Sequence, residues 1–520
     1  MKPTARSRPR LALTGWLTTL VLLVSCSSTA PANEAGGVPF EVRLEVDLSA
    51  DNGPVTGTLF QVGTGSGVQI GAGITFADNS TQLASATVVT FFARSEQRDV
   101  TTQDLGTPFT EAVPFHLVVL DGRLVAVPFD EQGILPRYWD VEQSSWTELQ
   151  SADPNLDDLR PVLMEIAGEA LEIIGDDVWY AGERISDAID WKGGTIMSAY
   201  FLDGALYLHV DYYDGGDQPS DSGYRVCAWS PGDQLDACAD HRFGNVFWSY
   251  AAMPDHESGS LIVFGSKGEI VDVSLDGGIS TVAGPNDVSN QIYSAVKFYD
   301  TWLLGHYPTG NLTSYDGHDT DQFADPPIGS QECSSEGQRE AQTVGVWGGE
   351  LAVGVWPWGE VWTGMPGEAW RLAARMFTGP APCGEAAYAD LVSTKPSFDF
   401  NALGQRIFGM ASWSTGIAVA TSAKNAQSAG ALALLDPEQR AEYGRVYLLE
   451  RDAEISCQLD SVPDSRLTFR LDGTSMKVIQ NGNEICSRSV NADELAPISG
   501  EVVVGSGAWG PFDGELTTVT

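Results

Sequence analysis

The chain has 520 residues, of which 70 are acidic and 29 basic, and its formal net charge at pH 7 is −41. Nucleic acids and other polyanions need a positively charged surface, so this composition excludes nucleic acid as a partner. Hydrophobic residues make up 43% of the sequence, enough for a large buried core. Short apolar stretches separated by DG, GG, PG and NG turns outnumber helical patterns, and this predicts an all-β protein.

The first 25 residues have the features of a secretory signal. Basic residues precede an apolar run, Leu11 to Val24, that is too short for a permanent membrane span. The run ends in LVSC, Leu23 to Cys26, and this junction resembles the lipobox of bacterial lipoproteins. The resemblance implies an exported protein whose lipidated Cys26 anchors it to the cell membrane or outer membrane, followed by a tether over residues 26–37.

Residues 38–100 are expected to form an N-terminal β module. Three stretches in it have strand character: FEVRLEVDLS, GTLFQVGTGSGVQIGAGITFAD and SATVVTFFARSE. Glycines are frequent in the second stretch, but their spacing matches neither a dinucleotide-binding nor a phosphate-binding loop, and no helix follows. We interpret them as positions where strands bulge or pack closely.

Residues 101–457 contain a repeat of about fifty residues. Each unit has an apolar strand, a tight turn, a second apolar strand, a polar or aromatic loop and a further strand pair. The units are seen at 115–149, 169–187, 197–238, 248–270, 293–317, 342–372 and 406–457. In the last unit, the segment 443–457 is expected to supply the closing strand pair.

These units resemble the blades of a seven-bladed β-propeller of the kelch or quinoprotein kind. Trp139-Asp140 is the only WD dipeptide, so the repeat is not of the WD40 type. Residues 458–520 resemble the last strands of laminin-G or concanavalin-like sandwiches, with a DG turn, an NG turn and the piece FDGEL. We therefore expect a propeller inserted in, or flanked by, a concanavalin-like sandwich built from both chain ends. The alternative is two unrelated small β modules.

Six cysteines remain after Cys26, and an even number in an exported chain predicts three disulfides. No pair has the CxxC spacing of a zinc site, and no metal ligand set is expected. The positions of these cysteines in the proposed blades favour the pairs Cys227–Cys238, Cys333–Cys383 and Cys457–Cys486.

In a propeller, the loop after the second strand of each blade lies on the face that usually holds the ligand. This loop supplies the candidate ligand-binding residues, which are Asp130, Glu131, Glu183, Arg184, Asp211, Tyr212, Lys267, His306, Tyr307, Trp356 and Trp358. Strand alternation from Val355 predicts that the rings of Trp356 and Trp358 face opposite ways and that one is exposed. The alternative is that these residues are ordinary loop and core residues.

Aromatic rings beside polar groups of both charges are typical of sugar-binding surfaces. The sequence therefore predicts a protein that binds an extracellular glycan, or a partner protein, at the propeller mouth or on the sandwich. The alternative is a carbohydrate-active enzyme, a glycoside hydrolase or polysaccharide lyase, although no spacing selects catalytic residues. His116, His209 and His241 are expected to be structural. No cofactor is expected, but the acidic loops 211–221 and 316–325 offer oxygen ligands for Ca²⁺.

Overall fold

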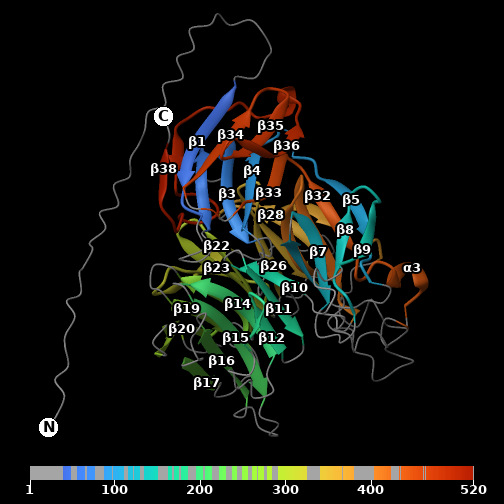
Figure 1. Ribbon diagram of the computed structural model, residues 1–520. Coiled ribbons are helices and arrows are strands. Elements are labelled where there is room, and N and C mark those ends of the chain that lie inside the picture. Colours follow the sequence, from blue (N-terminus) through green and yellow to red (C-terminus); the bar gives the residue numbers. More distant parts are fainter. Residues whose placement is uncertain are drawn as a thin grey trace, which may run out of the picture.

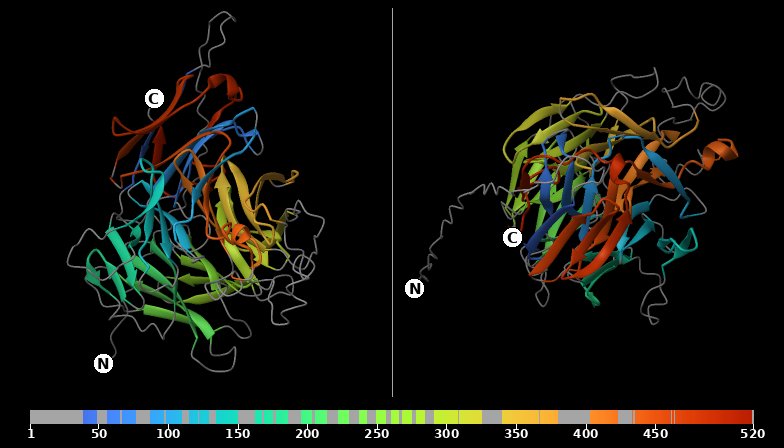
Figure 2. Two further views of the ribbon diagram at one scale, coloured as in Figure 1. Left: turned by 90° about the vertical axis from the view of Figure 1, so that its right-hand side faces the viewer. Right: turned by 90° about the horizontal axis from the view of Figure 1, so that it is seen from above.

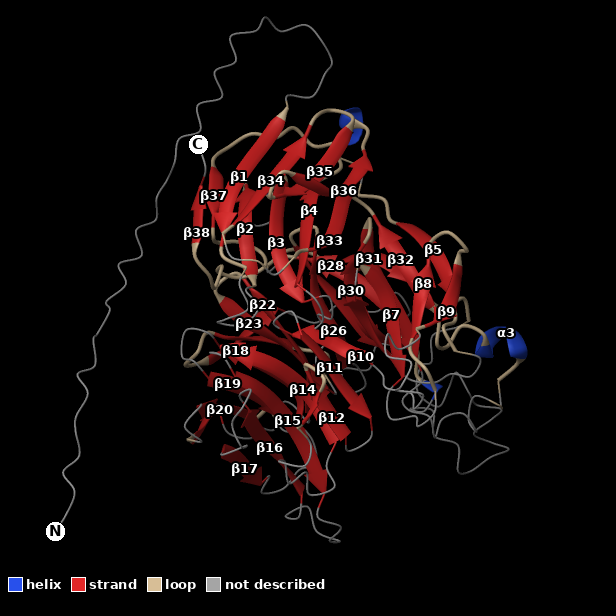
Figure 3. Ribbon diagram, in the orientation of Figure 1, coloured by secondary structure: helices blue, strands red, loops and turns tan. Residues whose placement is uncertain are grey.

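The computed structural model describes residues 39–518 with gaps, of which the longer ones span 49–55, 77–86, 150–161, 186–194, 214–221, 230–236, 284–290, 325–339, 380–402 and 423–432. The described chain is almost entirely β-structure, which confirms the all-β prediction (Figures 1 and 3). Its named helices are the one-turn α3 (Pro437–Arg440) and the 3-10 helix η8 (Ala492–Glu494). None of the helices in this described part is long and apolar enough to cross a membrane.

Seven antiparallel sheets of four strands each make up what we term the seven-sheet module. The first four sheets contain β6 (Phe115–Leu120), β7 (Arg123–Pro128), β8 (Arg137–Asp140) and β9 (Ser145–Glu148); β10 (Val162–Ile166), β11 (Glu169–Ile174), β12 (Asp177–Tyr180) and β13 (Glu183–Arg184); β14 (Thr195–Leu202), β15 (Ala205–Tyr213), β16 (Ser222–Trp229) and β17 (Ala237–Arg242); and β18 (Ser249–Asp255), β19 (Ser260–Gly265), β20 (Ile270–Ser274) and β21 (Ile279–Ala283). The other three contain β22 (Gln291–Phe298), β23 (Thr301–Tyr307), β24 (Leu312–Tyr315) and β25 (Thr320–Ala324); β26 (Glu340–Trp347), β27 (Glu350–Trp356), β28 (Glu360–Gly364) and β29 (Arg371–Arg375); and β30 (Arg406–Trp413), β31 (Gly416–Ser422), β32 (Val446–Glu450) and β5 (Thr101–Gly106).

The first strands of neighbouring sheets lie side by side and give the module a propeller-like arrangement. Contacts join β14 to β18, β18 to β22, β22 to β26, β26 to β30, β30 to β6 and β6 to β10. Two hydroxyl groups strengthen this inner layer: Ser294 Oγ donates to Ala341 O at 3.0 Å, and Thr343 Oγ1 donates to Ile407 O at 2.5 Å. These bonds join equivalent positions in the first strands of the fifth, sixth and seventh sheets.

The seventh sheet is completed by a strand from the other end of the repeat region. β5, which precedes the first sheet in sequence, pairs antiparallel with β32. The prediction that residues 443–457 supply both closing strands is therefore wrong. The second of the expected strands, β33 (Ala453–Gln458), pairs with β4 (Thr87–Ala93) in another sheet. Both β5 and β33 have strand character, and the sequence pattern of a strand does not identify its partner.

The second unit also differs from its expected alignment. The stretch EALEII, taken as its first strand, is the second strand β11, and β10 is the inner strand. The expected alignment overlooked β10 because Glu165 interrupts the apolar run VLMEI. One consequence is that Glu183 and Arg184 form the outermost strand β13 and do not follow the second strand.

The two ends of the chain form two five-stranded sheets, which we term the two-sheet module. One sheet has the order β36 (Asn483–Ser489), β35 (Ser475–Gln480), β34 (Ser465–Leu471), β1 (Phe40–Val46) and β38 (Leu516–Thr518). The other has the order β33, β4, β3 (Ile70–Phe76), β2 (Gly57–Val62) and β37 (Val502–Val504). A single core fills the space between the sheets and includes Phe60, Phe91 and Phe469, whose ring centroids lie 5.2–6.2 Å apart.

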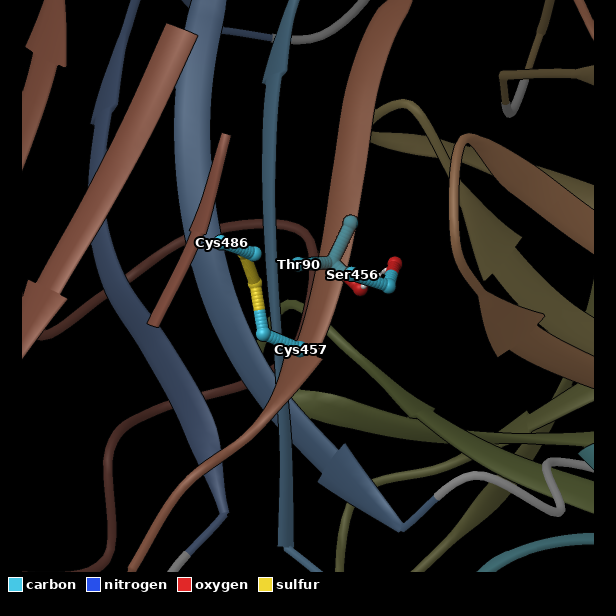
Figure 4. The surroundings of a disulfide bond; sticks show 4 residues. All are labelled: Thr90, Ser456, Cys457 and Cys486. Carbon is cyan, nitrogen blue, oxygen red and sulfur yellow. Dashed lines mark hydrogen bonds between the residues drawn. A yellow bond between two sulfur atoms is a disulfide. The ribbon is translucent and has the colours of Figure 1, made fainter. Parts of the chain in front are cut away.

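A disulfide joins the two sheets of this module. Cys457 on β33 is bonded to Cys486 on β36, with the Cα atoms 6.2 Å apart (Figure 4). On the strand next to β33, Thr90 Oγ1 lies 2.9 Å from Ser456 Oγ. Of the other expected pairs, Cys227 is disulfide-bonded and stands opposite Cys238 in the register of β16 and β17. Cys333 and Cys383 lie outside the described residues, as does Cys26.

The two-sheet module lies against one face of the seven-sheet module (Figures 1 and 2). We term this face the turn face because it carries the tight turns between the first and second strands. Ser456 N donates to Ser414 O at 2.7 Å, and Gly122 N donates to Gln458 Oε1 at 2.7 Å. Arg488 Nη1 donates to Thr415 O at 3.0 Å. The opposite face, where first strands begin and second strands end, is termed the loop face.

Candidate functional site on the loop face

The loop face brings the start of each first strand beside the end of the second. The register pairs Gln291 with Tyr307 in the fifth sheet, and Glu340 with Trp356 in the sixth. In six of the seven sheets this register shifts near the start of the first strand, for example between Ile292 and Ser294. A bulge adds one residue to the first strand and redirects its side chain.

A row of side chains crosses the loop face from the fifth to the seventh sheet. Tyr293, the bulge residue of β22, contacts the Tyr307 ring edge-on at a centroid distance of 5.9 Å. Tyr307 contacts the Trp356 ring at 6.4 Å, and the guanidinium of Arg406 lies 5.0 Å from the Trp356 centroid. We term these four residues the aromatic–arginine row. Tyr307 is its most accessible ring, while Tyr293 is 9% exposed and Trp356 is 2% exposed.

Arg406 is held on its two other sides by polar groups of β26. Its Nη2 lies 3.3 Å from Glu340 Oε1, and its Nε donates to Gln342 Oε1 at 3.2 Å. The side chains of Arg406 and Glu340 are 3% and 1% exposed. A buried ion pair of this kind fixes both groups in place, because loss of either one would leave an uncompensated buried charge. The pair therefore fixes Arg406 beside the Trp356 ring.

Both tryptophans of the WPW motif are buried, so the prediction that one ring is exposed is wrong. Trp356 packs against the backbone of Gly404, where a Cβ atom would overlap the indole ring. Trp358 is 1% exposed and belongs to the core between the fifth and sixth sheets and the two-sheet module. Strand alternation could not be extended across the motif because β27 ends at Trp356. Trp356 is therefore a buried ring against which the Tyr307 ring packs.

Three of the described histidines, His116, His209 and His306, are core residues. His306 is 5% exposed; its Nε2 lies 2.7 Å from Thr313 Oγ1, and its Nδ1 has no hydrogen-bond partner among the described residues. Burial lowers the pKa of His306 to about 4, so the ring is neutral at pH 7. Burial also lowers the pKa of His116 to about 4 and that of His209 to about 3. The side chain of His241 lies outside the described residues.

The remaining predicted residues fall into two groups. Glu183 and Arg184 are exposed on β13, away from the end of a second strand, so their assignment to the binding loop is wrong. Asp211 and Tyr212 lie at the end of β15, where Asp211 is opposite Thr195, but their side chains are outside the described residues. Asp130, Glu131 and Lys267 lie outside the described residues altogether.

One of the two acidic loops considered for Ca²⁺ is partly described. Asp316 Oδ1 accepts hydrogen bonds from His318 N at 2.9 Å and Asp319 N at 2.8 Å. These backbone bonds lower the pKa of Asp316. They show that its carboxylate stabilises the turn, which is a common role of Asp at this position. Within the residues that the structure places, no three His, Cys, Asp or Glu side chains gather as a metal site would require.

The sequence interpretation missed Tyr293, Glu340, Gln342 and Arg406 because it considered only the loop after each second strand. The repeat does contain a signal for these four residues. In each first strand a small residue, Ser294, Thr343 or Gly409, follows the register shift, and the missed residues lie one to three positions before it. Alignment of the first strands, and not only of the loops, would have placed these side chains on the same face.

No family model and no curated protein matches the chain. Among solved structures, it is similar to virginiamycin B lyase from Staphylococcus aureus, with 9% identity over 68% of this chain and 99% of that one, at a TM-score of 0.39. YCF48 from Cyanidioschyzon merolae is 12% identical over 67% and 98% of the two chains, at a TM-score of 0.37. A prolyl endopeptidase is 11% identical over 71% and 55%, at 0.34. TM-scores below 0.5 establish neither a shared fold nor a shared activity.

Proposed function

We propose that the chain is an exported, lipid-anchored protein of the cell envelope that binds an extracellular glycan on its loop face. In this proposal the seven sheets are the blades of a propeller, and the two-sheet module is a concanavalin-like sandwich inserted through both chain ends. Lipidated Cys26 and the tether over residues 26–37 hold the protein at the membrane. The basic region, apolar run and LVSC junction at the N-terminus support the anchor.

The aromatic–arginine row is the main support for placing the binding site on the loop face. The two-sheet module contacts the turn face at the first and seventh sheets, and the loop face lies on the opposite side of the seven-sheet module. On it, the partly exposed Tyr307 ring is supported by Tyr293 and by Trp356. A fixed aromatic ring with neighbouring hydrogen-bonding groups suits a sugar, which presents an apolar C–H face and a rim of hydroxyl groups.

Glu340, which lies beside the row, offers no support for hydrolysis. A general acid has to reach the leaving-group oxygen to protonate it. Glu340 is buried, and its Oε1 lies 3.3 Å from Arg406 Nη2, so it holds Arg406 in place rather than facing a leaving group.

The test uses the protein lacking residues 1–26 on a glycan array, with a reducing-end assay on every glycan that binds. Tyr307→Ala should abolish or weaken binding at least about tenfold, the effect of roughly 1.4 kcal/mol of lost stacking and contact. Tyr138→Ala is the matched control, because Tyr138 is a partly buried tyrosine beside Arg123 on the first sheet. Equal binding by both variants would exclude the row as the site, and release of reducing ends would favour the enzyme instead.

The anchor is tested separately in cells. Cys26→Ser should move the protein from the membrane fraction to the soluble exported fraction. Sedimentation of this variant with membranes after a salt wash would show that lipidation is not the anchor. This result would leave the glycan-binding proposal unaffected.

A further inference from the structure

One sheet of the two-sheet module, with the order β36, β35, β34, β1 and β38, turns one face away from the core (Figure 1). Alternate residues of its strands point into the core, among them Leu44, Phe469 and Val478. The residues between them point outward and are exposed or partly exposed. We term this surface the outer sheet face. The described charged side chains on it are Glu41, Arg43, Glu45, Arg466, Arg470, Lys477 and Glu484.

The outer sheet face differs in charge from the chain as a whole. Its four described cationic side chains outnumber its three described carboxylates, which leaves a net charge of +1. The full chain has 70 acidic and 29 basic residues and a net charge of −41. A negatively charged surface therefore repels the chain as a whole but not this face.

Two of the cations stand side by side at the middle of the face. Arg470 on β34 lies directly opposite Lys477 on β35 in the antiparallel register, and like charges in this position weaken strand pairing. Their carboxylate partners lie on the outer sides of the pair. Glu41 on β1 is 2.7 Å from Arg470 Nε, and Glu484 on β36 is 2.8 Å from Lys477 Nζ. The middle of the face is therefore positively charged.

The cations of the outer sheet face remain accessible to a partner. Arg466 and Arg470 each donate to a carboxylate through Nε, at 2.9 and 2.7 Å, and their Nη groups have no hydrogen-bond partner in the described part of the chain. Their side chains are 74% and 42% exposed. Ion pairs this exposed contribute little to stability, so these cations can interact with further negative groups at little cost.

The proposed lipid anchor keeps a membrane within reach of this face. Residues 27–39 connect Cys26 to β1, which begins at Phe40. A chain of this length spans at most about 50 Å even when it is fully extended. If Cys26 is held in the bilayer, the outer sheet face is confined near the lipid headgroups at a high effective concentration.

We propose that the outer sheet face docks on anionic phospholipid headgroups of the membrane that holds the anchor. This inference rests on the anchor in the proposed function. The four cations approach the headgroup phosphates, and the acidic remainder of the chain is directed away from the bilayer. The seven-sheet module contacts the other sheet of the two-sheet module, through Ser456 and Gln458 of β33. Docking in this orientation therefore turns the loop face away from the membrane and toward an extracellular ligand.

The test captures the protein on vesicles through a hexahistidine tag that replaces residues 1–26 and binds a nickel-chelating lipid. The vesicles contain phosphatidylcholine with or without phosphatidylglycerol. A donor dye on Ser487→Cys, an exposed position opposite Lys477, reports energy transfer to acceptor-labelled headgroups. Transfer should be higher with phosphatidylglycerol and should fall to the phosphatidylcholine value in 1 M salt, where charges are screened within about 3 Å. A dye on Val141→Cys, in the first four-stranded sheet, should show no such rise.

A double variant tests whether the cations of the face cause this rise. Arg470→Gln/Lys477→Gln should lower the docking equilibrium constant by about fivefold per cation removed, the effect of one cation at an anionic surface. Arg123→Gln/Arg445→Gln is the matched control, because it changes the charge of the chain equally on the seven-sheet module. Equal losses in the two variants, or equal transfer on both kinds of vesicle, would overturn the proposal.

Two further outcomes are separated by the same proteins. Sedimentation velocity that shows self-association of the wild type, abolished in Arg470→Gln/Lys477→Gln, would assign the face to a second copy of the chain and overturn docking on lipid. The tag takes the place of Cys26, so a failure of the anchor in the Cys26→Ser fractionation leaves the energy-transfer result unchanged. The two proposals therefore fail in different experiments.

Discussion

Arg451 and Glu350 connect the two modules through a buried ion pair in which Nη1 of Arg451 lies 2.7 Å from Oε2 of Glu350. Arg451 lies between β32 of the seventh four-stranded sheet and β33 of the two-sheet module, and Glu350 begins β27 in the sixth sheet. Arg451 also donates to Trp347 O across the same interface. The pair thus joins the turn between β26 and β27 to the segment of chain that passes from the seven-sheet module to the two-sheet module. We therefore expect both modules to unfold together.

Replacing Glu350 with Gln should destabilise the protein strongly. The substitution removes the carboxylate that pairs with the buried guanidinium groups of Arg94 and Arg451, and breaking a buried ion pair costs about 3–5 kcal/mol of unfolding free energy. Denaturant unfolding monitored by tryptophan fluorescence measures the loss. Glu45→Gln is the control, because Glu45 forms an exposed pair with Arg466 and such pairs contribute little. Similar stabilities for the two variants would contradict a structural role for the Glu350 network.

Stability should depend on pH through two buried carboxyl groups with opposite shifts. Although burial opposes it, Arg451 and Arg94 lower the pKa of Glu350 to about 2, so its contribution is complete above pH 4.5 and is lost as the pH falls toward 2. Burial raises the pKa of Glu454 to about 8, so the native state holds a proton that the unfolded state releases above pH 4.5. This group should therefore lower the unfolding free energy by about 1.4 kcal/mol per pH unit between pH 4.5 and 8.

Glu454→Gln isolates the second of these effects. Glu454 is 1% exposed on β33, its two carboxyl oxygens have no hydrogen-bond partner in the described part of the chain, and its charged neighbours are Arg451, Asp452, Arg488 and Glu450. A glutamine keeps the shape and cannot ionise, so the decrease in stability between pH 4.5 and 8 should become shallower. An identical slope in the variant and the wild type would show that Glu454 is already ionised in the native state.

The burial of Trp356 predicts that it acts on stability. Trp356→Ala should cost about 3–5 kcal/mol, as for other large core side chains. Gly404→Ala should also destabilise, because the new methyl group would overlap the Trp356 indole. Thermal melts measure both, with Val141→Ala as the control, since Val141 is 68% exposed. A Trp356→Ala variant that melts like the wild type would contradict the burial of this ring and would favour an accessible, ligand-binding role for it.

Loss of the disulfide between Cys457 and Cys486 should loosen the two-sheet module. The bond closes a loop with a sequence separation of 29 residues, for which the loss of unfolded-state entropy is worth about 3–4 kcal/mol. Cys486→Ser should therefore lower the melting temperature measured without reductant. Adding reductant should lower the Tm of the wild type further than that of the variant. A variant as stable as the oxidised wild type would contradict this role.

Local patterns explain which parts of the fold were predicted correctly. The apolar stretches and DG turns around Leu117 and Leu206 mark antiparallel hairpins because a strand and its tight turn are encoded by adjacent residues. The pairing of β1 with β34 and of β2 with β37 also agrees with the prediction that both chain ends contribute to one structure. The sequence did not predict that β5 takes the place of β33 in the seventh sheet, because β5 and β33 each pair with a strand that is remote in sequence.

Side-chain environment explains the errors at the candidate site. Trp356 ends a strand and Trp358 follows it, in a motif that resembles an exposed loop. The burial of Trp356 depends on Gly404, and that of Trp358 on the core shared with the two-sheet module. Glu350 and Arg371 look like ordinary surface charges in the sequence. They join one ion-pair network only when Arg94, Arg98 and Arg451 arrive from other parts of the chain.

By itself, the sequence determined the β-strands, most hairpins and the acidic character of the surface, because strand alternation, turn residues and charge are local properties. The tertiary structure decided which strands close the seventh sheet, which aromatic ring stays accessible on the loop face, and where four arginines meet around Glu350. These outcomes depend on contacts between residues hundreds of positions apart, and burial and pKa follow from such contacts rather than from residue type.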